Sequence, residues 1–344
     1  MSTAARTALE PASSRAVEPL VETRALTKLY NLGTGFLAKK KAVLSAVEDF
    51  SLTIDRGETL GLVGESGSGK STVARLLMRL VEPTRGEILF EGRNISRFSS
   101  RELRRLRGRI QIVFQDPYSS LNPRHSVGRI IGEGIQNENG RRSRAARVRE
   151  LLDLVGLTTD VLDRYPHEFS GGQRQRICIA RALAVGPEFL VLDEPVSALD
   201  VSIQSKILNL LQDLKRQLNL TYLFISHDLS VVHHVADRVA VMYLGHLVEL
   251  GPKQVVYRNP LHPYTQALLS AVPTTTRQAV TNRRVRLSGE IPSPIDIPER
   301  CRFATRCPRQ IEHCWQEVPP LEEVERDHLV ACFNYAPLER APTG

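Results

Sequence analysis

The sequence predicts an α/β fold in which a largely parallel sheet is covered by helices. Thr59–Val63 is a short apolar run, followed by a glycine-rich loop and then by Ser71–Leu80, where apolar residues recur at helical spacing. Phe189–Leu192 and Tyr222–Ile225 are two further apolar runs of the kind found in buried parallel strands. Between them, Val201–Leu218 has the pattern of an amphipathic helix. Strands that alternate with helices in this way are typical of a sheet with helices packed on its faces.

The sequence around these elements suggests how the chain is divided. Residues 1–20 are rich in Ala, Ser and Pro without periodicity, which predicts a flexible tail. We expect one large domain over residues 21–251, with a further strand at Arg238–Tyr243. Between residues 116 and 175 no comparable strand run occurs, and Arg144–Val155 has helical spacing. A helical subdomain is therefore expected there.

The composition changes after Gly251. Frequent prolines are typical of irregular chain, because proline interrupts helices and strands. They recur after Gly251 at Pro252, Pro260, Pro263, Pro273, Pro292, Pro294 and Pro298. We expect residues 252–344 to form a small appended extension. It also contains a cluster of cysteines, at Cys301, Cys307, Cys314 and Cys332.

Composition and charge limit the classes of function. The 344 residues carry a net charge of +8, but aromatic residues make up only 6% of the chain and are not interleaved with the basic runs Arg101–Arg109 and Arg141–Arg149. No stacking platform is indicated, so we expect no nucleic-acid partner. No apolar stretch approaches the ~18 residues of a spanning helix, and the N-terminus lacks the apolar centre of a secretory signal. We expect a cytosolic protein that reaches a membrane only by docking.

The loop from Gly64 to Ser71 carries the most specific chemistry. It matches the phosphate-loop pattern without a mismatch, and its glycines allow backbone N–H groups to converge on phosphates at the positive end of the next helix. Lys70 is expected to reach the β- and γ-phosphates and the Ser71 hydroxyl to bind Mg²⁺. A chance glycine-rich turn is the alternative, but the preceding strand and following helix supply the required context. The predicted nucleotide-binding residues are Gly64, Ser66, Gly67, Ser68, Gly69, Lys70, Ser71 and Thr72.

An acidic pair follows the apolar run Phe189–Leu192. Asp193 is placed to hold Mg²⁺, as the strand-end aspartate of phosphate-loop NTPases does. Glu194 is placed to orient or deprotonate the attacking water. Such a pair is more often a helix N-terminal signal, but its position downstream of a phosphate loop favours the catalytic interpretation.

A third motif identifies a family. The segment Phe169-Ser170-Gly171-Gly172-Gln173 resembles the signature motif of ABC ATPases. Gln115, the segment Ser197–Asp200 and His227 complete the family's set of motifs, in the family's order. The resemblance covers about residues 21–251. It implies the ABC-type ATPase fold, a mixed sheet core with a helical subdomain, that binds and hydrolyses ATP with Mg²⁺.

The resemblance also implies roles for individual residues. Tyr30 would stack on adenine, although a tyrosine near a strand end can equally serve packing. Gln115 would contact Mg²⁺ and its water, and His227 would contact the γ-phosphate. The signature residues Ser170, Gly171, Gly172 and Gln173 would bind the ATP held by an opposing subunit, so that two cassettes enclose two nucleotides. The second cassette must then come from another chain.

The extension resembles the C-terminal part of oligopeptide and dipeptide importer ATPases. This resemblance rests on Asn259–Thr265, on Gly289–Pro294 and on the segments around the cysteines. Phe114–Tyr118 and Tyr222–His227 further resemble the F-type subunit of that family. It implies a paired D-type ATPase, two transmembrane permeases and an extracytoplasmic substrate-binding protein, with this chain at the cytoplasmic face of the membrane.

The expected function is therefore to energise the import of dipeptides or oligopeptides. Relatives in this branch also serve nickel, glutathione or sugars, so the cargo has alternatives within the family. An alternative of a different class is a soluble regulatory or nucleic-acid-linked ABC protein that uses the basic surface.

The clustered cysteines suggest a metal. Cytosolic thiols stay reduced, which favours metal over disulfides. The gaps of 5, 6 and 17 residues between Cys301, Cys307, Cys314 and Cys332 match no compact zinc knuckle. Relatives imply a 4Fe-4S cluster held by the four thiolates, zinc is the alternative, and a metal-free group of buried cysteines is the third possibility. Cys178, which follows the signature, is expected to be a small core residue.

Overall fold

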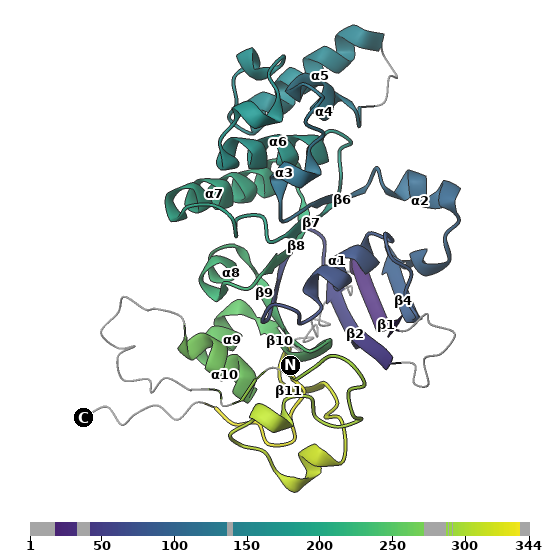
Figure 1. Cartoon of the computed structure of the whole chain (residues 1–344), viewed down its shortest axis with the longest axis vertical. Coiled ribbons are helices and arrows are strands. Elements are labelled where there is room, and N and C mark those ends of the chain that lie inside the picture. The colour runs from purple at the N-terminus through teal and green to yellow at the C-terminus, as the bar shows by residue number, and fades with distance from the viewer. Residues whose placement is uncertain are drawn as a thin grey trace, which may run out of the picture.

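The computed structural model describes residues 18–32, 42–135, 140–271, 287, 289–290 and 292–337, with residues 140–143 described by their backbone alone. These residues form an antiparallel sheet, a larger central sheet and helices on the other side of that sheet (Figure 1). Helices from residues 117–183 form one end of the molecule, and the C-terminal residues form the other.

The central sheet has eight strands. They are β3 (Thr59–Val63), β6 (Ile110–Val113), β7 (Phe189–Asp193), β8 (Thr221–Ser226), β9 (Arg238–Tyr243), β10 (His246–Pro252), β11 (Glu322–Glu325) and β12 (His328–Val330). Their order across the sheet is β11-β12-β10-β9-β3-β8-β7-β6. The strands from β9 to β6 are parallel, and β10, β12 and β11 continue the sheet antiparallel. The predicted α/β fold is confirmed.

Alternate residues of the parallel strands face two hydrophobic cores, as a pleated sheet requires. In β7, Phe189 and Val191 belong to the core between the two sheets, while Leu190 and Leu192 belong to the core under the helices. Both faces are apolar because both are covered, which explains the unbroken apolar runs in the sequence.

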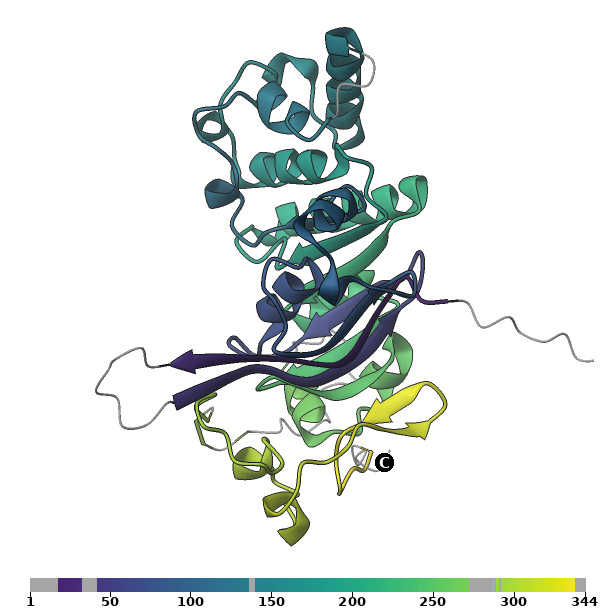
Figure 2. The ribbon, with the colours of Figure 1, turned by 90° about the vertical axis from the view of Figure 1, so that its right-hand side faces the viewer.

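The antiparallel sheet consists of β1 (Val21–Leu32), β2 (Ala42–Ile54), β4 (Arg85–Phe90) and β5 (Arg93–Asn94) in the order β2-β1-β4-β5. Figure 2 shows β1 and β2 as a long ribbon that projects to one side. Residues 1–17 of the expected tail lie outside the described residues. Leu20, at the end of that tail, is buried, and its N–H donates to the carbonyl of Ile54 at 2.9 Å.

The helices are α1 (Lys70–Leu77), α2 (Ser100–Leu106), α3 (Pro117–Ser120), α4 (Val127–Gly132), α5 (Gly140–Leu154), α6 (Gly171–Leu183), α7 (Val201–Leu218), α8 (Leu229–Val235), α9 (Lys253–Arg258) and α10 (Pro263–Ser270). The predicted helix Val201–Leu218 is found with the same bounds. The prediction that α1 would reach Leu80 is wrong. Arg79 adopts φ +49°, in the left-handed region that ends a helix, and Leu80 is 48% exposed.

Helices α3–α6 form the helical part of the chain, whose core includes Val148, Leu151 and Ile177. Because α6 continues to Leu183, this part extends beyond residue 175. It joins the sheet through α6, which packs near β6 and α7.

The chain after Gly251 is more regular than its prolines suggest. Helices α9 and α10 follow β10 directly, where irregular chain was expected. Strand β12 then returns to pair with β10, so the extension adds two strands to the central sheet. The described residues between α10 and β11 include the short 3₁₀ turns η5 (Ala304–Arg306) and η6 (Glu312–Trp315). None of the helices in the described part of the chain has the length and apolarity needed to cross a membrane.

Candidate functional site

The phosphate loop connects β3 to α1, and two of its glycines admit no side chain. A Cβ on Gly64 would lie 2.2 Å from the carbonyl oxygen of Met242, and one on Gly69 would lie 2.2 Å from that of Ala46. Gly69 also adopts φ +104° at the N-cap of α1 and provides no side chain to cap the helix. The first N–H groups of α1 are therefore left for an anion.

Lys70 is folded back into the loop. Its ammonium donates to the carbonyls of Gly64 at 2.8 Å and Glu65 at 2.9 Å, and lies 3.3 Å from the hydroxyl of Ser68. Burial lowers the pKa of Lys70, while the nearby carboxylates of Glu194 and Asp193 oppose that shift. The loop thus already holds a buried cation at the place where phosphate oxygens are expected.

Ser71 and Asp193, the two residues expected to bind Mg²⁺, contact each other. The Ser71 hydroxyl donates to Asp193 Oδ1 at 3.1 Å across the gap between α1 and the end of β7. Asp193 is only 6% exposed, and burial raises the pKa of its carboxyl. A hydroxyl and a buried carboxylate are oxygen ligands of the type that Mg²⁺ prefers.

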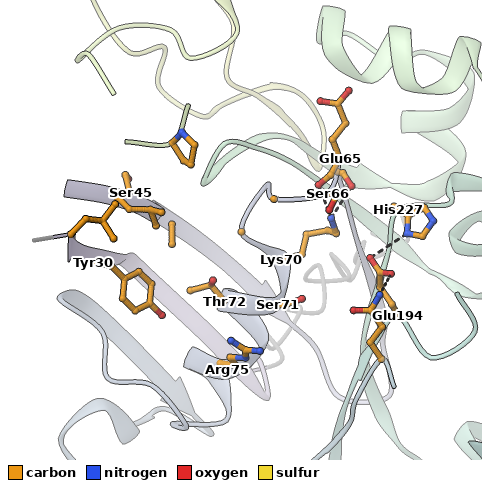
Figure 3. A pocket seen from close by; sticks show the side chains of 18 of the residues that line it. Tyr30, Ser45, Glu65, Ser66, Lys70, Ser71, Thr72, Arg75, Glu194 and His227 are labelled. Atoms are coloured by element: carbon orange, nitrogen blue, oxygen red, sulfur yellow. Dashed lines mark hydrogen bonds and ion pairs between the residues drawn. The ribbon is translucent and has the colours of Figure 1, made fainter. Parts of the chain in front are cut away.

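Glu194 is held between two other predicted residues. Gln115 donates from Nε2 to Glu194 Oε2 at 2.9 Å, and His227 Nδ1 lies 3.2 Å from Oε1 (Figure 3). Glu194 itself adopts φ +49°, a strained conformation for this residue type. Such strain at the end of a parallel strand is typical of functional positions.

Most of these groups line one cavity of about 1190 Å³, but Ser68 and Asp193 are not in its wall. Figure 3 shows Tyr30 and Ser45 at one end, Lys70 and Ser71 in the middle, and Glu194 with His227 at the other end. Of the predicted residues, the cavity wall includes Tyr30, Gly64, Ser66, Gly67, Gly69, Lys70, Ser71, Thr72, Gln115, Glu194 and His227. Tyr30 has a packing contact too, because the Lys28 ammonium lies 4.9 Å from its ring centroid.

The sequence did not single out Arg75 or residues of β2, although they line the same cavity. Arg75 lies one helical turn after Ser71, so helical spacing could have placed it beside the phosphate loop. Ser45 and Ala46 carry no motif. Only the folding of β2 over the loop brings them there.

The signature residues are not in the wall of this cavity. Ser170 caps α6, accepting from the Gln173 N–H at 3.4 Å, and the Gln173 side chain accepts from the Ser170 N–H at 3.1 Å. A Cβ on Gly172 would lie 2.5 Å from Ile203 Cγ2, so a larger residue would push α6 away from α7. The chain therefore presents a phosphate loop and a signature that do not meet.

The extension brings its four cysteines near one another. Cys301 donates its N–H to the carbonyl of Cys314 at 3.1 Å. Burial, with contributions from the neighbouring thiols, raises the pKa of Cys301 to about 12 and that of Cys332 to about 11. Among the residues that the structure describes, no group of three or more His, Cys, Asp or Glu is arranged to hold a metal ion. Cys178 is 1% exposed, as expected of a core residue.

A phosphate loop, a strand-end Asp–Glu pair and a separate capped signature, on a sheet flanked by a helical part, define an ATP-binding cassette. Comparison with solved structures agrees. A dimeric, post-hydrolysis structure of the ATP-binding cassette MJ0796 with ADP and Pi has a TM-score of 0.60 and 28% identity, covering 68% of this chain and 98% of that one. CbiO1 of Clostridium perfringens has a TM-score of 0.61 and 30% identity, covering 70% of this chain and 91% of that one.

Sequence comparison identifies the branch. The ABC transporter family matches residues 47–197, and the C-terminal region of oligopeptide/dipeptide transporters matches residues 248–314. The oligopeptide transport ATP-binding protein AppF of Bacillus subtilis is 51% identical over 323 residues, which are 93% of this chain and 98% of that protein. The probable peptide ABC transporter ATP-binding protein y4tS of Sinorhizobium fredii is 49% identical over 326 residues, 94% of this chain and 92% of that protein. The chain belongs to the ATP-binding proteins of ABC transporters, in the oligopeptide/dipeptide family.

Proposed function

We propose that this chain hydrolyses ATP as one half of a cassette pair and so drives the import of dipeptides or oligopeptides. The observation that supports this most directly is that Glu194 lies in the cavity wall and Asp193 is hydrogen-bonded to Ser71 of that wall, while Ser170 is not in the wall. One chain then supplies the catalytic carboxylates and a second chain supplies the signature. A related, D-type ATPase is the proposed partner.

The side chains around the phosphate end of the cavity have the following proposed tasks. Lys70 exchanges the carbonyls of Gly64 and Glu65 for phosphate oxygens, which accept more strongly because they are charged. Ser71, Asp193 and Gln115 would hold Mg²⁺, which neutralises charge on the phosphates when bound.

Hydrolysis requires a water held in line with the terminal phosphate. Glu194 is the proposed group that orients this water and accepts its proton. Gln115 donates a hydrogen bond to Glu194 and His227 Nδ1 lies 3.2 Å from the same carboxylate, so both side chains fix its direction. His227 is also proposed to contact the γ-phosphate.

ATP hydrolysis can be coupled to transport because ATP binding and closure of the cassette pair are linked equilibria. ATP binds between two cassettes more tightly when they are closed, so it shifts the pair towards closure, and hydrolysis removes that preference. The helical part between Gln115 and Ser170 connects both halves of the site and is the proposed route to two permease subunits. The chain would then act at the cytoplasmic face of the membrane, supplied by an extracytoplasmic binding protein.

The decisive experiment reconstitutes the chain with its partner ATPase, permeases and binding protein in liposomes. ATP hydrolysis should rise when the binding protein is loaded with a short peptide such as trialanine, and not with Ni²⁺ or glutathione. A reversed preference would reassign the cargo within the family. Stimulation by DNA or RNA without any membrane component would instead favour a soluble regulatory function.

We also propose that the four cysteines of the extension hold a 4Fe-4S cluster, with zinc as the alternative. The donor set supports this, since Cys301, Cys307, Cys314 and Cys332 are buried or half-buried thiols gathered within one small unit. Their arrangement without metal is not that of a ligand set, so binding would require the side chains to converge. Anaerobically purified protein should show broad visible absorbance and about four irons per chain, and colourless, iron-free protein would contradict the cluster.

A further inference from the structure

The C-terminal extension reaches the phosphate loop through Glu65. The guanidinium of Arg306, in η5, forms a two-pronged ion pair with this carboxylate, with Nη1 at 2.8 Å from Oε2 and Nη2 at 3.3 Å from Oε1. Arg306 is 8% exposed and the Glu65 side chain 26%. Two parallel hydrogen bonds between a guanidinium and a carboxylate fix direction as well as distance. The second residue of the loop is thus anchored from outside the cassette.

The backbone of Glu65 is held by the extension as well. Its N–H donates to the phenolic oxygen of Tyr264, in α10, at 2.9 Å. Tyr264 is completely buried and packs against Tyr243 and Phe303, with ring centroids 4.7 and 5.5 Å away. The anchor is therefore rigid, because its rings are locked into the core.

Glu65 in turn contacts the residue that binds phosphate. Its carbonyl accepts from the Lys70 ammonium at 2.9 Å. A continuous series of contacts therefore runs from Arg306 through Glu65 to Lys70. Any change in the position of Glu65 alters the geometry of the loop that must enclose the phosphates.

The extension touches the other end of the cavity too. The Ser45 N–H donates to the carbonyl of Pro294 at 3.0 Å, and Leu44 forms an antiparallel bridge with Ile295. Pro294 itself lines the cavity. The guanidinium of Arg302 contacts Ser45 and Glu48 of β2 as well. Residues 294–306 thus contact both the phosphate end and the Tyr30 end of the site.

We propose that Arg306 and Tyr264 are positioning residues for the phosphate loop, and that the extension is an integral part of the nucleotide site in this chain. The structural match with the MJ0796 cassette covers 98% of that chain but only 68% of this one. A cassette can therefore be built without the additional residues, so their effect should be on affinity. The proposal rests on ATP binding and does not depend on peptide transport.

The test is equilibrium binding of the fluorescent analogue MANT-ATP to the full chain, with steady-state hydrolysis in the paired complex. Arg306→Gln should weaken binding about tenfold, within the range of coupling found for contacting pairs. The KM for ATP should rise in parallel, and kcat should change less than twofold.

Glu65→Gln should weaken MANT-ATP binding by the same factor, and the double variant should bind no more weakly than either single variant. Tyr264→Phe, which removes only the hydroxyl, should weaken binding about threefold.

The matched control is Arg300→Gln, in the same segment, because Arg300 lies over Trp315 instead of contacting the loop. Thermal unfolding without nucleotide separates folding from positioning. If Arg306→Gln fails to fold, Glu65→Gln and Tyr264→Phe test the same contacts from the other side. Unchanged MANT-ATP affinity in the folded variants, or losses in Arg306→Gln and Glu65→Gln that simply add, would overturn the proposal. Failure of the unmodified chain to bind MANT-ATP would instead contradict the proposed function.

Discussion

The phosphate loop and the signature each precede the N-terminus of a helix, but they treat its free N–H groups in opposite ways. At α1 the N-cap is Gly69, which offers no side chain, and the Lys70 ammonium is turned into the loop. At α6 the N-cap is Ser170, and a reciprocal capping box with Gln173 satisfies two N–H groups, those of Ser170 and Gln173. The first site is open to an anion within its own chain. The second site is stabilised by its capping box without a nucleotide, and it remains exposed so that it can bind the nucleotide of another chain.

The largest effect should come from the open site. Lys70→Ala removes the only side-chain cation described inside the loop, and loss of a buried charge partner typically weakens binding by about 2–5 kcal/mol. ATP affinity of the single chain should fall at least about thirtyfold, measured by MANT-ATP fluorescence. Lys206→Ala, on the exposed face of α7, is the control. If Lys70→Ala kept its affinity for ATP, the N-terminus of α1 would not be the anion site that distinguishes it from the N-terminus of α6.

Glu194→Gln should separate binding from chemistry at the same site. The amide cannot accept a proton from water, so hydrolysis by the paired complex should fall about 10²–10⁴-fold, while ATP binding persists and the closed pair accumulates. Phosphate release and size-exclusion chromatography measure the two properties. Glu82→Gln, at a side chain that is 87% exposed, should change neither. Undiminished turnover would remove Glu194 from the catalytic role.

Ser170→Ala tests the capped site. Loss of an N-cap costs about 1 kcal/mol of folding free energy, and hydrolysis by the pair should fall about tenfold, as expected for the loss of one hydrogen bond to the nucleotide. ATP binding to the single chain should be unaffected. The control is Ser99→Ala, because Ser99 caps α2 with the same reciprocal arrangement. Equal effects of both variants on hydrolysis would show that only stability is involved.

The smallest effect concerns the buried charge of the open site. Burial raises the pKa of Asp193 above its ordinary value of 3.8, so its ionised form destabilises the nucleotide-free fold at neutral pH. Asp193→Asn should stabilise that fold by about 0.5–2 kcal/mol at pH 7, and the gain should disappear as the pH falls below 3.8. Chemical denaturation at several pH values measures it, with the exposed Asp213→Asn as control. A loss of stability at pH 7 would contradict this.

Local patterns predicted the parts of the site that depend on neighbours in sequence. The phosphate loop required only β3, the six residues 64–69 and α1, and Val201–Leu218 was predicted from its apolar face. Leu80 was misplaced because apolar spacing continues past Arg79, where the backbone turns into the left-handed region. The spacing of apolar side chains does not show where the backbone leaves the helical conformation, so the end of α1 could not be predicted from it.

What the sequence did not show depends on pairings between distant residues. Arg306 and Glu65 are 241 positions apart, and the sequence prediction used the segment around Cys307, which includes Arg306, only for its resemblance to the importer ATPase extension. The pairing of β12 with β10 is similar, since His328–Val330 is too short to suggest a strand by itself. Such contacts form only when the chain folds, because their residues are far apart in sequence. They therefore produce no regular spacing of residue types from which they could be predicted.

The return of the chain to the central sheet has a consequence for solubility. Without residues beyond 252, β10 would be an outer strand with unpaired N–H and C=O groups and largely buried, apolar side chains such as Leu247 and Leu250. An outer strand of this kind can pair with other molecules and aggregate. In the described sheet the outermost strand is instead β11, whose sequence Glu322-Glu323-Val324-Glu325 presents like charges that repel another copy. A chain truncated at the end of the cassette should therefore precipitate, even though every nucleotide motif would still be present.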